Sequence, residues 1–405
     1  MTVPSLRRAA PVLPGPTRSR RPLPRPARFG RLLLGPARFG RLLLGPAVAV
    51  AVLAPAAPAW AHGADAPAAT DYRTEVTGVA PDRPGLTVRT IEAGARLELT
   101  STGGRTVVVL GYQGEPYLEV RPDGVYENVN SPATYLNRTL DGDTPVPAGA
   151  GPTQPPQWNR IATEPVARWH DQRIQWRESA PPAVVRADPG REHRIRDWAI
   201  PVRDGDTVGE IRGTLDWVPP PDPYTWWAGI LLGVLAVGTL GLLPAGTRAG
   251  RRAMSTLGAL SAVGGLAAVS FAVAREVDAG ADGLTGLLGG LFTTGIWPLL
   301  TGLGALAAGG YALVRRPAAD FAVALAGICL ALFAGVSNAA VLARAVAPVP
   351  WPAQSARLVI ASTVLLGAGV AAAGALRLRS TARVSRRHPT PAPVDHGVVV
   401  GDKGE

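Results

Sequence analysis

The chain has one cysteine and one lysine among its 405 residues. A single cysteine excludes an intramolecular disulfide and any zinc site built from several thiolates. The other 40 basic residues are arginine, and against 30 acidic residues they give a net charge of +11. So positive a chain would ordinarily suggest a nucleic-acid partner, but the position of the charge argues against that function.

Acidic residues are absent from residues 1–46, which hold ten arginines. The rest of the chain is almost neutral, with 31 basic and 30 acidic residues. An uncharged stretch follows Arg41 and ends in Ala59-Trp60-Ala61, so a basic region, an apolar region and small residues at the cut predict a signal peptide cleaved after Ala61. The alternative is an uncleaved anchor helix, which the prolines of this stretch disfavour. The charge belongs to residues 1–61, and we expect no nucleic-acid partner.

Residues 62–225 carry 23 acids and 17 arginines and show the alternation typical of half-buried strands. We expect an extracytoplasmic all-β domain, β-sandwich-like, because turn signals separate short strand-forming runs. The predicted strands are Leu86–Ile91, Arg96–Thr100, Thr106–Tyr112, Tyr117–Val120, Trp198–Val202 and Glu210–Trp217. Between about 130 and 192 the pattern fades into a proline-rich stretch, for which a binding loop and a partly ordered insertion are both open.

Residues 226–376 predict an all-α transmembrane bundle of five helices. Each apolar stretch is long enough to cross about 30 Å of hydrocarbon. The predicted spans are 226–244, 253–274, 291–314, 319–343 and 357–376. The chain is therefore expected to have the lipid bilayer as a partner, and Pro298 is expected to kink the third span.

Arginines between the spans predict the topology. With the β domain outside, ten arginines fall on the inner side and only Arg275, Arg344 and Arg357 on the outer side. This distribution follows the positive-inside rule. We therefore expect a multi-pass protein of the cell membrane, with residues 377–405 as a disordered cytoplasmic tail.

Charged groups are scarce inside the spans, which disfavours a transporter or a proton relay. Asp320 lies one turn from Arg315 and Arg316, and we interpret it as an interfacial or ion-paired acid. Asn338 is expected to form a hydrogen bond between helices.

Histidine is rare too, with five in the chain. Cleavage after Ala61 would leave His62 at the N-terminus, where its amine and imidazole form a chelate suited to Cu(II). Exported copper-binding β-sandwich proteins of the copper-resistance type resemble this arrangement. His170 and His193 are the other histidines of the expected outer domain, and they are the candidate partners of His62 in a copper site.

A second cluster reads RWHDQRIQW at 168–176, and it joins GYQGEPY at 111–117 and NSPATYLN at 130–137. Here the chain resembles a family of actinobacterial multi-pass membrane proteins with GYxGEPYL and WHDHRxHW motifs. The resemblance covers nearly the whole chain and implies a signal peptide, an exported β domain and C-terminal transmembrane helices; it implies no activity. The family has histidine where this chain has Gln172 and Gln175, and amides bind transition metals poorly.

We interpret this cluster as a possible binding loop, in which Glu115 is a buried acid and Asp171 orients His170 or pairs with Arg168 or Arg173. The candidate residues of this loop are Glu115, Tyr117, Trp169, Asp171, Arg173 and Trp176. A metal site that includes His170 is the alternative.

No nucleophile–histidine–acid pattern, phosphate loop or HExxH motif is present, so we expect no enzyme. The first hypothesis is a non-enzymatic membrane protein that presents its β domain for binding an extracytoplasmic protein partner or for envelope support. The alternative is a copper-handling membrane protein that uses His62 with His170 or His193. The sequence leaves the oligomeric state open.

Overall fold

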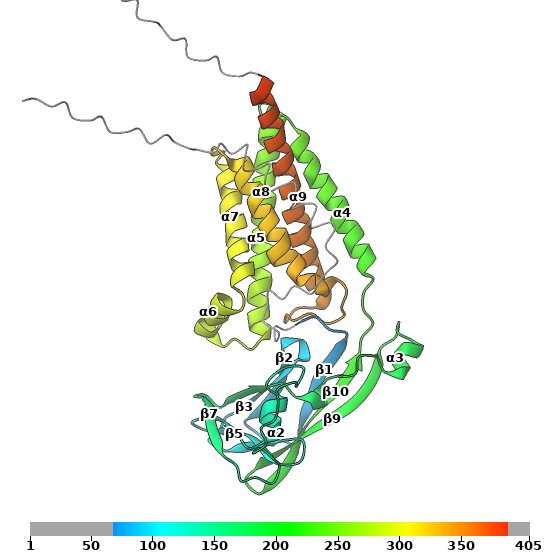
Figure 1. Cartoon of the computed structure of the whole chain (residues 1–405), viewed down its shortest axis with the longest axis vertical. Helices are drawn as coiled ribbons and strands as arrows, with labels where there is room; N and C mark the ends of the chain where they lie inside the picture. Colours follow the sequence, from blue (N-terminus) through cyan, green and yellow to red (C-terminus); the bar gives the residue numbers. More distant parts are fainter. Residues whose placement is uncertain (1–67, 388–405) are drawn as a thin grey trace, which may run out of the picture.

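A computed structural model describes residues 68–387, and it divides them into a strand-rich part and a helical part (Figure 1). Strands occur between Tyr72 and Trp217, and long helices occupy the chain from Pro223 onward. The signal peptide, its cut, His62 and the chain beyond 387 lie outside the described residues. The expected order of an all-β domain followed by a five-helix bundle is confirmed.

The β domain contains two antiparallel sheets. The larger sheet has the spatial order β1 (Tyr72–Ala80), β10 (Thr207–Trp217), β9 (His193–Asp204), β4 (Val107–Leu110), β5 (Pro116–Arg121), β6 (Gly124–Asn128) and β7 (Trp158–Ala162). The smaller sheet has the order β2 (Leu86–Ile91), β3 (Arg96–Ser101) and β8 (Val166–Trp169).

One apolar core lies between the two sheets, because alternate side chains of a strand point to the same face. Leu97 and Leu99 from β3 are fully buried together with Val109 from β4 and Ile200 and Val202 from β9. The six strands predicted from alternation are all present, some of them longer than expected. β1, β6, β7 and β8 were not predicted.

The stretch from 130 to 192 contains both short elements and loop, and residues 138–157 form no helix or strand. It contains β7 and β8, the helices α2 (Pro132–Leu136) and α3 (Ala183–Ala187), and the one-turn helix η2 (Gln172–Ile174). β8 has only four residues and pairs with β3, about 70 residues earlier in the chain. Local sequence patterns cannot reveal so short a strand, because its partner is remote.

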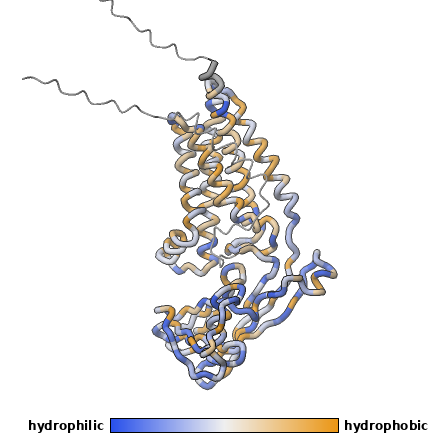
Figure 2. The backbone as a smooth tube through the Cα atoms, viewed as in Figure 1, coloured by the Kyte–Doolittle hydropathy of each residue, from blue (hydrophilic) through white to orange (hydrophobic). Residues whose placement is uncertain are grey.

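The helical part contains five stretches long and apolar enough to cross a membrane, and Figure 2 shows the hydrophobic residues concentrated there. The helices are α4 (Pro223–Thr239) with η3 (Leu240–Leu242), α5 (Arg248–Asp278), α6 (Gly283–Thr293), α7 (Ile296–Leu313), α8 (Ala319–Cys329) with η4 (Leu330–Gly335) and η5 (Val336–Leu342), and α9 (Ala353–Arg387). The protein is therefore a membrane protein with a β domain.

The helices alternate in direction: α4, α7 and α9 run away from the β domain, and α5 and α8 run back toward it (Figure 1). The arginines expected inside therefore gather at the end of the bundle remote from the β domain, which we call the arginine-rich end. Among the described residues it comprises Arg248, Arg251, Arg252, Arg315, Arg316, Arg377 and Arg379.

One local expectation in the bundle is corrected, and one is confirmed. Pro298 does not kink a span, because the predicted span 291–314 is split and α7 begins at Ile296. Proline is tolerated there, since the first turn of a helix has no internal acceptor for its N–H groups. Asp320, in the first turn of α8, is ion-paired as expected, and its partner is Arg377, whose Nε lies 2.5 Å away.

The bundle packs closely where glycines face each other across α8 and α9. A Cβ added to Gly327 would lie 2.6 Å from the Gly367 carbonyl oxygen and 2.7 Å from the Ala371 nitrogen. The helices approach so closely because neither glycine has a side chain.

We expect Gly327→Ala to lower the free energy of unfolding by about 1–3 kcal/mol, because the backbones of α8 and α9 must separate. Thermal unfolding of the full chain in detergent measures the change. Gly310→Ala is the matched control, since a Cβ at that position meets nothing within 4 Å. Equal stability of the two variants would contradict this account of the packing.

Candidate functional site

The three sequence segments that carry the family resemblance meet at one place in the β domain. The Tyr112 hydroxyl donates to Asn137 Oδ1 and accepts from the Gln172 backbone nitrogen at 2.9 Å. Glu115 accepts from Ser131 Oγ at 3.0 Å and from the Gln113 nitrogen at 2.9 Å. The segments therefore form one polar network, which the sequence predicted only as three separate motifs.

Asp171 is the most deeply buried acid of this network, with no exposed surface. Its carboxylate accepts from the Trp169 indole at 3.2 Å, from the Arg173 backbone nitrogen at 3.0 Å and from the Arg173 guanidinium at 2.8 Å. Arg173 also donates to the carbonyls of Leu110 and Gly111, and its guanidinium lies over the ring of Tyr112. Of the three partners considered for Asp171, the structure has Arg173.

Glu115 and Tyr117 are also buried, at 4% and 5% exposed. Burial raises the pKa of Tyr117, and burial followed by the charge of Asp171 raises that of Tyr112. Both phenols therefore remain protonated hydrogen-bond donors at neutral pH. Among the six residues of the predicted binding loop, Glu115, Tyr117, Trp169 and Asp171 are buried and hold the loop together.

His170 follows β8 and is 3% exposed. Its Nδ1 lies 2.9 Å from the Ala95 carbonyl, and its Nε2 accepts from Arg96 Nε at 3.1 Å. Gln175, where the family has histidine, donates to the same Ala95 carbonyl at 2.9 Å. Both ring nitrogens of His170 are thus engaged with protein groups.

His193 begins β9, and its Nε2 lies 2.7 Å from the Asp188 carbonyl. Within residues 68–387, no group of three histidine, cysteine or acidic side chains is arranged to hold a metal ion. His62 lies outside the described residues. The copper site therefore stays a prediction that rests on His62.

A different set of residues forms hydrogen bonds between the β domain and the bundle. The sequence analysis predicted none of these contacts. Asp71 is 2% exposed and accepts from Arg344 Nη1 at 2.5 Å and from the Ala345 nitrogen at 2.9 Å. Beside it, Thr70 and Val346 exchange two backbone hydrogen bonds. The segment before β1 is in this way bound to the loop between η5 and α9.

Further contacts reach the end of α5 and the loop that follows it. The Ala93 nitrogen, in the one-turn helix η1 (Glu92–Gly94), donates to Asp278 Oδ2 at 2.9 Å. Arg168 Nη2 donates to the Gly280 carbonyl at 2.6 Å and to Asp282 Oδ2 at 2.7 Å. Together with the Asp71 contact, these bonds form the junction between the β domain and the bundle.

The helix η1 is strained at this junction. Glu92 and Ala93 have φ values of 57° and 56°, in the left-handed region that costs a residue with a Cβ free energy. Glu92 is 7% exposed, and one of its carboxylate oxygens has no hydrogen-bond partner, while the other accepts from Arg96. Burial raises the pKa of Glu92 above 4.5, against the opposing effect of Arg96.

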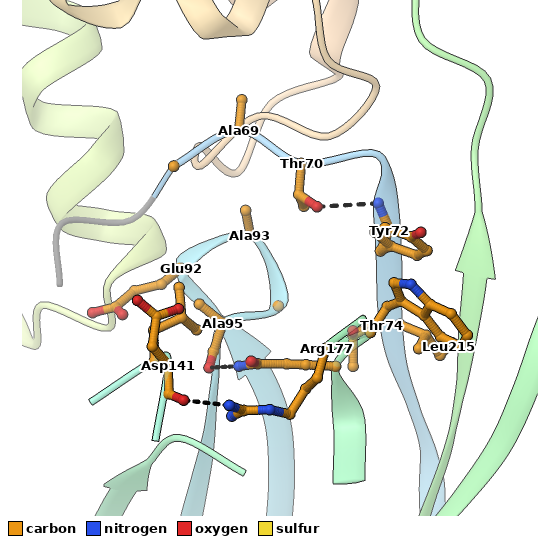
Figure 3. Close-up of a pocket in the computed structure, with 15 residues that line it drawn as sticks. Ala69, Thr70, Tyr72, Thr74, Glu92, Ala93, Ala95, Asp141, Arg177 and Leu215 are labelled. Carbon is orange, nitrogen blue, oxygen red and sulfur yellow. Dashed lines mark hydrogen bonds between the residues drawn. The ribbon is translucent and has the colours of Figure 1, made fainter. Parts of the chain in front are cut away.

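A cavity of about 330 Å³ lies beside the junction (Figure 3). Tyr72 and Trp176 form an aromatic wall, with ring centroids 6.3 Å apart and planes inclined by 19°. Thr74 and Gln175 are among its polar lining residues, and Arg177 donates to the Asp141 backbone carbonyl at its edge. Trp176 is the member of the predicted loop that lines this cavity.

Comparisons with family models, curated proteins and solved structures find no match to this chain. The resemblance to the actinobacterial family therefore stays a prediction.

The geometry of Asp171 predicts a large effect on stability. We expect Asp171→Asn to lower the free energy of unfolding of the β domain by about 3–5 kcal/mol, because Arg173 would be left as a buried charge without its counterion. Denaturant unfolding followed by tryptophan fluorescence measures it. Asp197→Asn, in a pair whose side chains are more than half exposed, should change little. A small effect at Asp171 would show that the pair is dispensable.

Glu92 predicts a pH dependence. Its raised pKa means that the folded protein binds this proton more tightly than the unfolded chain does. Acidification through the raised pKa therefore stabilises the folded state, and the gain is complete below 4.5. We expect Glu92→Gln to be more stable than the unmodified protein at neutral pH and to lose this advantage toward about pH 4.

Thermal unfolding of both proteins across this pH range measures the difference. Glu210→Gln is the control, since the Glu210 side chain is 41% exposed and pairs with Arg212. An advantage of Glu92→Gln that does not vary with pH would refute the assignment.

Proposed function

We propose that the chain is a non-enzymatic cell-membrane protein that holds an extracytoplasmic β domain in a fixed position for binding a partner. The observation that carries this proposal is the junction, in which buried Asp71 binds the loop before α9 and the strained helix η1 binds the end of α5. A flexibly tethered domain would not need these contacts. A domain fixed in this way presents a constant surface to a partner, or supports the envelope at a constant distance from the bilayer.

The orientation follows from charge. The arginine-rich end lies remote from the β domain, and the positive-inside rule places such an end in the cytoplasm. The β domain is then extracytoplasmic, in agreement with the signal peptide expected from residues 1–61.

The cavity beside the junction is the proposed point of contact. Its aromatic wall of Tyr72 and Trp176 offers a flat apolar surface, and Thr74 and Gln175 offer hydrogen-bonding groups. This mixture suits an inserted peptide segment of a protein partner, which carries both apolar side chains and backbone amides. The partner would touch the β domain next to the segment that is bonded to the bundle.

Binding is favoured over catalysis because the polar groups around Asp171 are engaged with one another. His170, Asp171 and Arg173 each have protein partners at hydrogen-bond distance. Copper handling remains the alternative hypothesis from the sequence, with His62 as the ligand on which it depends.

Crosslinking in living cells tests partner binding. A photoreactive phenylalanine replaces Trp176 in the cavity, and in a control protein it replaces Trp158 on the edge strand β7. We expect an adduct of the full chain with one discrete protein from position 176 and none from position 158. A chain that stays solitary at both positions under all growth conditions would count against partner binding, and an adduct from position 158 alone would exclude the cavity.

A further inference from the structure

A second cavity lies in the membrane part, far from the junction, between α7 and α8. It is an apolar groove of about 580 Å³. Small residues and large apolar residues line it, and we call the small ones the floor and the large ones the rim. The floor residues are Gly304, Ala307, Ala308, Ala322 and Ala326, and the rim residues are Trp297, Leu300, Tyr311, Phe321, Leu325 and Phe333. We call this cavity the α7–α8 groove.

The groove faces outward from the bundle. Leu300 and Leu325 on its rim are about half exposed, and a Cβ added to Gly304 would meet nothing within 4 Å. From Trp297 to Tyr311 the helix α7 advances about 21 Å, at 1.5 Å per residue. A groove of that length follows much of the roughly 30 Å of hydrocarbon, so its natural content is an apolar chain of the bilayer.

Two arginines follow Tyr311, which lies at one end of the groove, by four and five residues. Arg315 and Arg316 are exposed in the loop between α7 and α8, and neither has an ion-pair partner among residues 68–387. The nearest acid along the chain, Asp320 in the first turn of α8, pairs with Arg377 instead. Two positive charges at the membrane surface are therefore left without a counterion from the described protein.

Hydrogen bonds connect this loop to Tyr311 of the groove. The Tyr311 hydroxyl donates to the Pro317 carbonyl at 2.9 Å, and the Arg316 nitrogen donates to the Tyr311 carbonyl at 3.3 Å. Arg315 has a φ of 55°, a left-handed conformation that costs free energy for a residue with a Cβ. The turn thus holds both arginines within a few residues of the groove's end.

From this combination we infer that the α7–α8 groove binds one anionic phospholipid, with its acyl chain on the small-residue floor and its phosphate at Arg315 and Arg316. Basic residues at the cytoplasmic ends of helices attract anionic headgroups. Arginine suits the phosphate oxygens because its guanidinium donates hydrogen bonds in pairs. This inference rests on the proposed orientation, in which the arginine-rich end is cytoplasmic, but it does not depend on partner binding by the β domain.

A second copy of the chain fits the groove less well. Two copies related by a two-fold axis along the membrane normal would bring Arg315 and Arg316 of each copy to the same end of the interface. Four like charges would then lie close together without a counterion, which disfavours the pair. A lipid phosphate removes this repulsion.

Native mass spectrometry of the full chain in detergent tests the inference, with phosphatidylglycerol and phosphatidylcholine as probes. We expect one phosphatidylglycerol molecule per chain at concentrations at which phosphatidylcholine does not bind. Arg315→Gln combined with Arg316→Gln should weaken phosphatidylglycerol binding by about 25-fold, at roughly fivefold per arginine. Gly304→Leu should weaken it as well, with both arginines intact, because the side chain occupies the groove.

Arg248→Gln combined with Arg252→Gln is the matched control. It removes the same charge from exposed positions at the arginine-rich end, on α5, outside the groove lining. It should leave binding unchanged. An equal loss in this control, equal binding of the two lipids, or an unaltered affinity in a folded Gly304→Leu protein would each overturn the inference.

Thermal unfolding of each variant separates loss of binding from loss of folding. If Gly304→Leu does not fold, Arg315→Gln with Arg316→Gln decides alone, since both side chains are exposed and the fold does not depend on them. Unchanged phosphatidylglycerol binding by that variant overturns the inference, and so does a dimer without bound lipid.

Discussion

The buried carboxylate of Asp71 is the constraint on which the position of the β domain depends. Its side chain binds Arg344 and the Ala345 nitrogen, while its backbone carbonyl accepts from the Val218 nitrogen at 2.8 Å. Val218 directly follows β10, the last strand before α4. One residue therefore joins the beginning of the β domain, its end and the loop before α9. Burying a carboxylate is costly unless hydrogen bonds replace water, and here two donors replace it.

The loop before α9 is stabilised from its other side as well. Arg357, at the beginning of α9, donates to the carbonyls of Arg344 and Ala345 at 2.9 and 3.0 Å. The backbone N–H and the arginine of this short loop thus donate to Asp71, while two of its carbonyls accept from Arg357 of α9. A disturbance of the β domain would reach α9 through these bonds, and it would reach α5 through Ala93 and Asp278. The helix α5 continues the connection, because Arg275 donates to Asn338 Oδ1 at 2.7 Å, between α5 and η5. This confirms the interhelical hydrogen bond expected for Asn338.

The parts of the fold that could be predicted are those whose signal is local. β2 was predicted to the residue because LTVRTI alternates and is bounded by turn residues. β1 was missed because glycine interrupts it and its pairing shifts between Val76 and Gly78, which breaks the alternation. The five spans were found because length and apolarity suffice to identify them. Pro298 was misinterpreted because it lies within an apolar stretch, in which the sequence does not show that α7 begins two residues before it.

The candidate site followed the same rule. Glu115 and Asp171 were predicted as site residues because they lie within the sequence motifs, and both are buried acids in the structure. Their partners Ser131 and Arg173 were within the motifs, but the meeting of the three motifs depends on strand pairing that no single segment reveals. Asp71 and Glu92 gave no signal at all, because an isolated acid before a strand resembles any surface residue. The cavity they flank is likewise built from segments as distant as Thr70 and Leu215.

These contacts need the guanidinium of arginine and could not be formed by lysine. Arg173 contacts a carboxylate and two backbone carbonyls at once, and Arg377 contacts Asp320 and the carbonyls of Leu243 and Gly250. A lysine ammonium, with three donors at one point, could not span such separated acceptors, whereas the planar guanidinium can. Arginines of this kind are fixed by the protein itself. Arg315 and Arg316 differ because the nearest acid along the chain, Asp320 at the beginning of α8, is paired with Arg377. Their two positive charges lie at the arginine-rich end, within reach of the phosphates of the bilayer. Because Asp320 pairs with Arg377, Arg315 and Arg316 are available to bind a lipid phosphate.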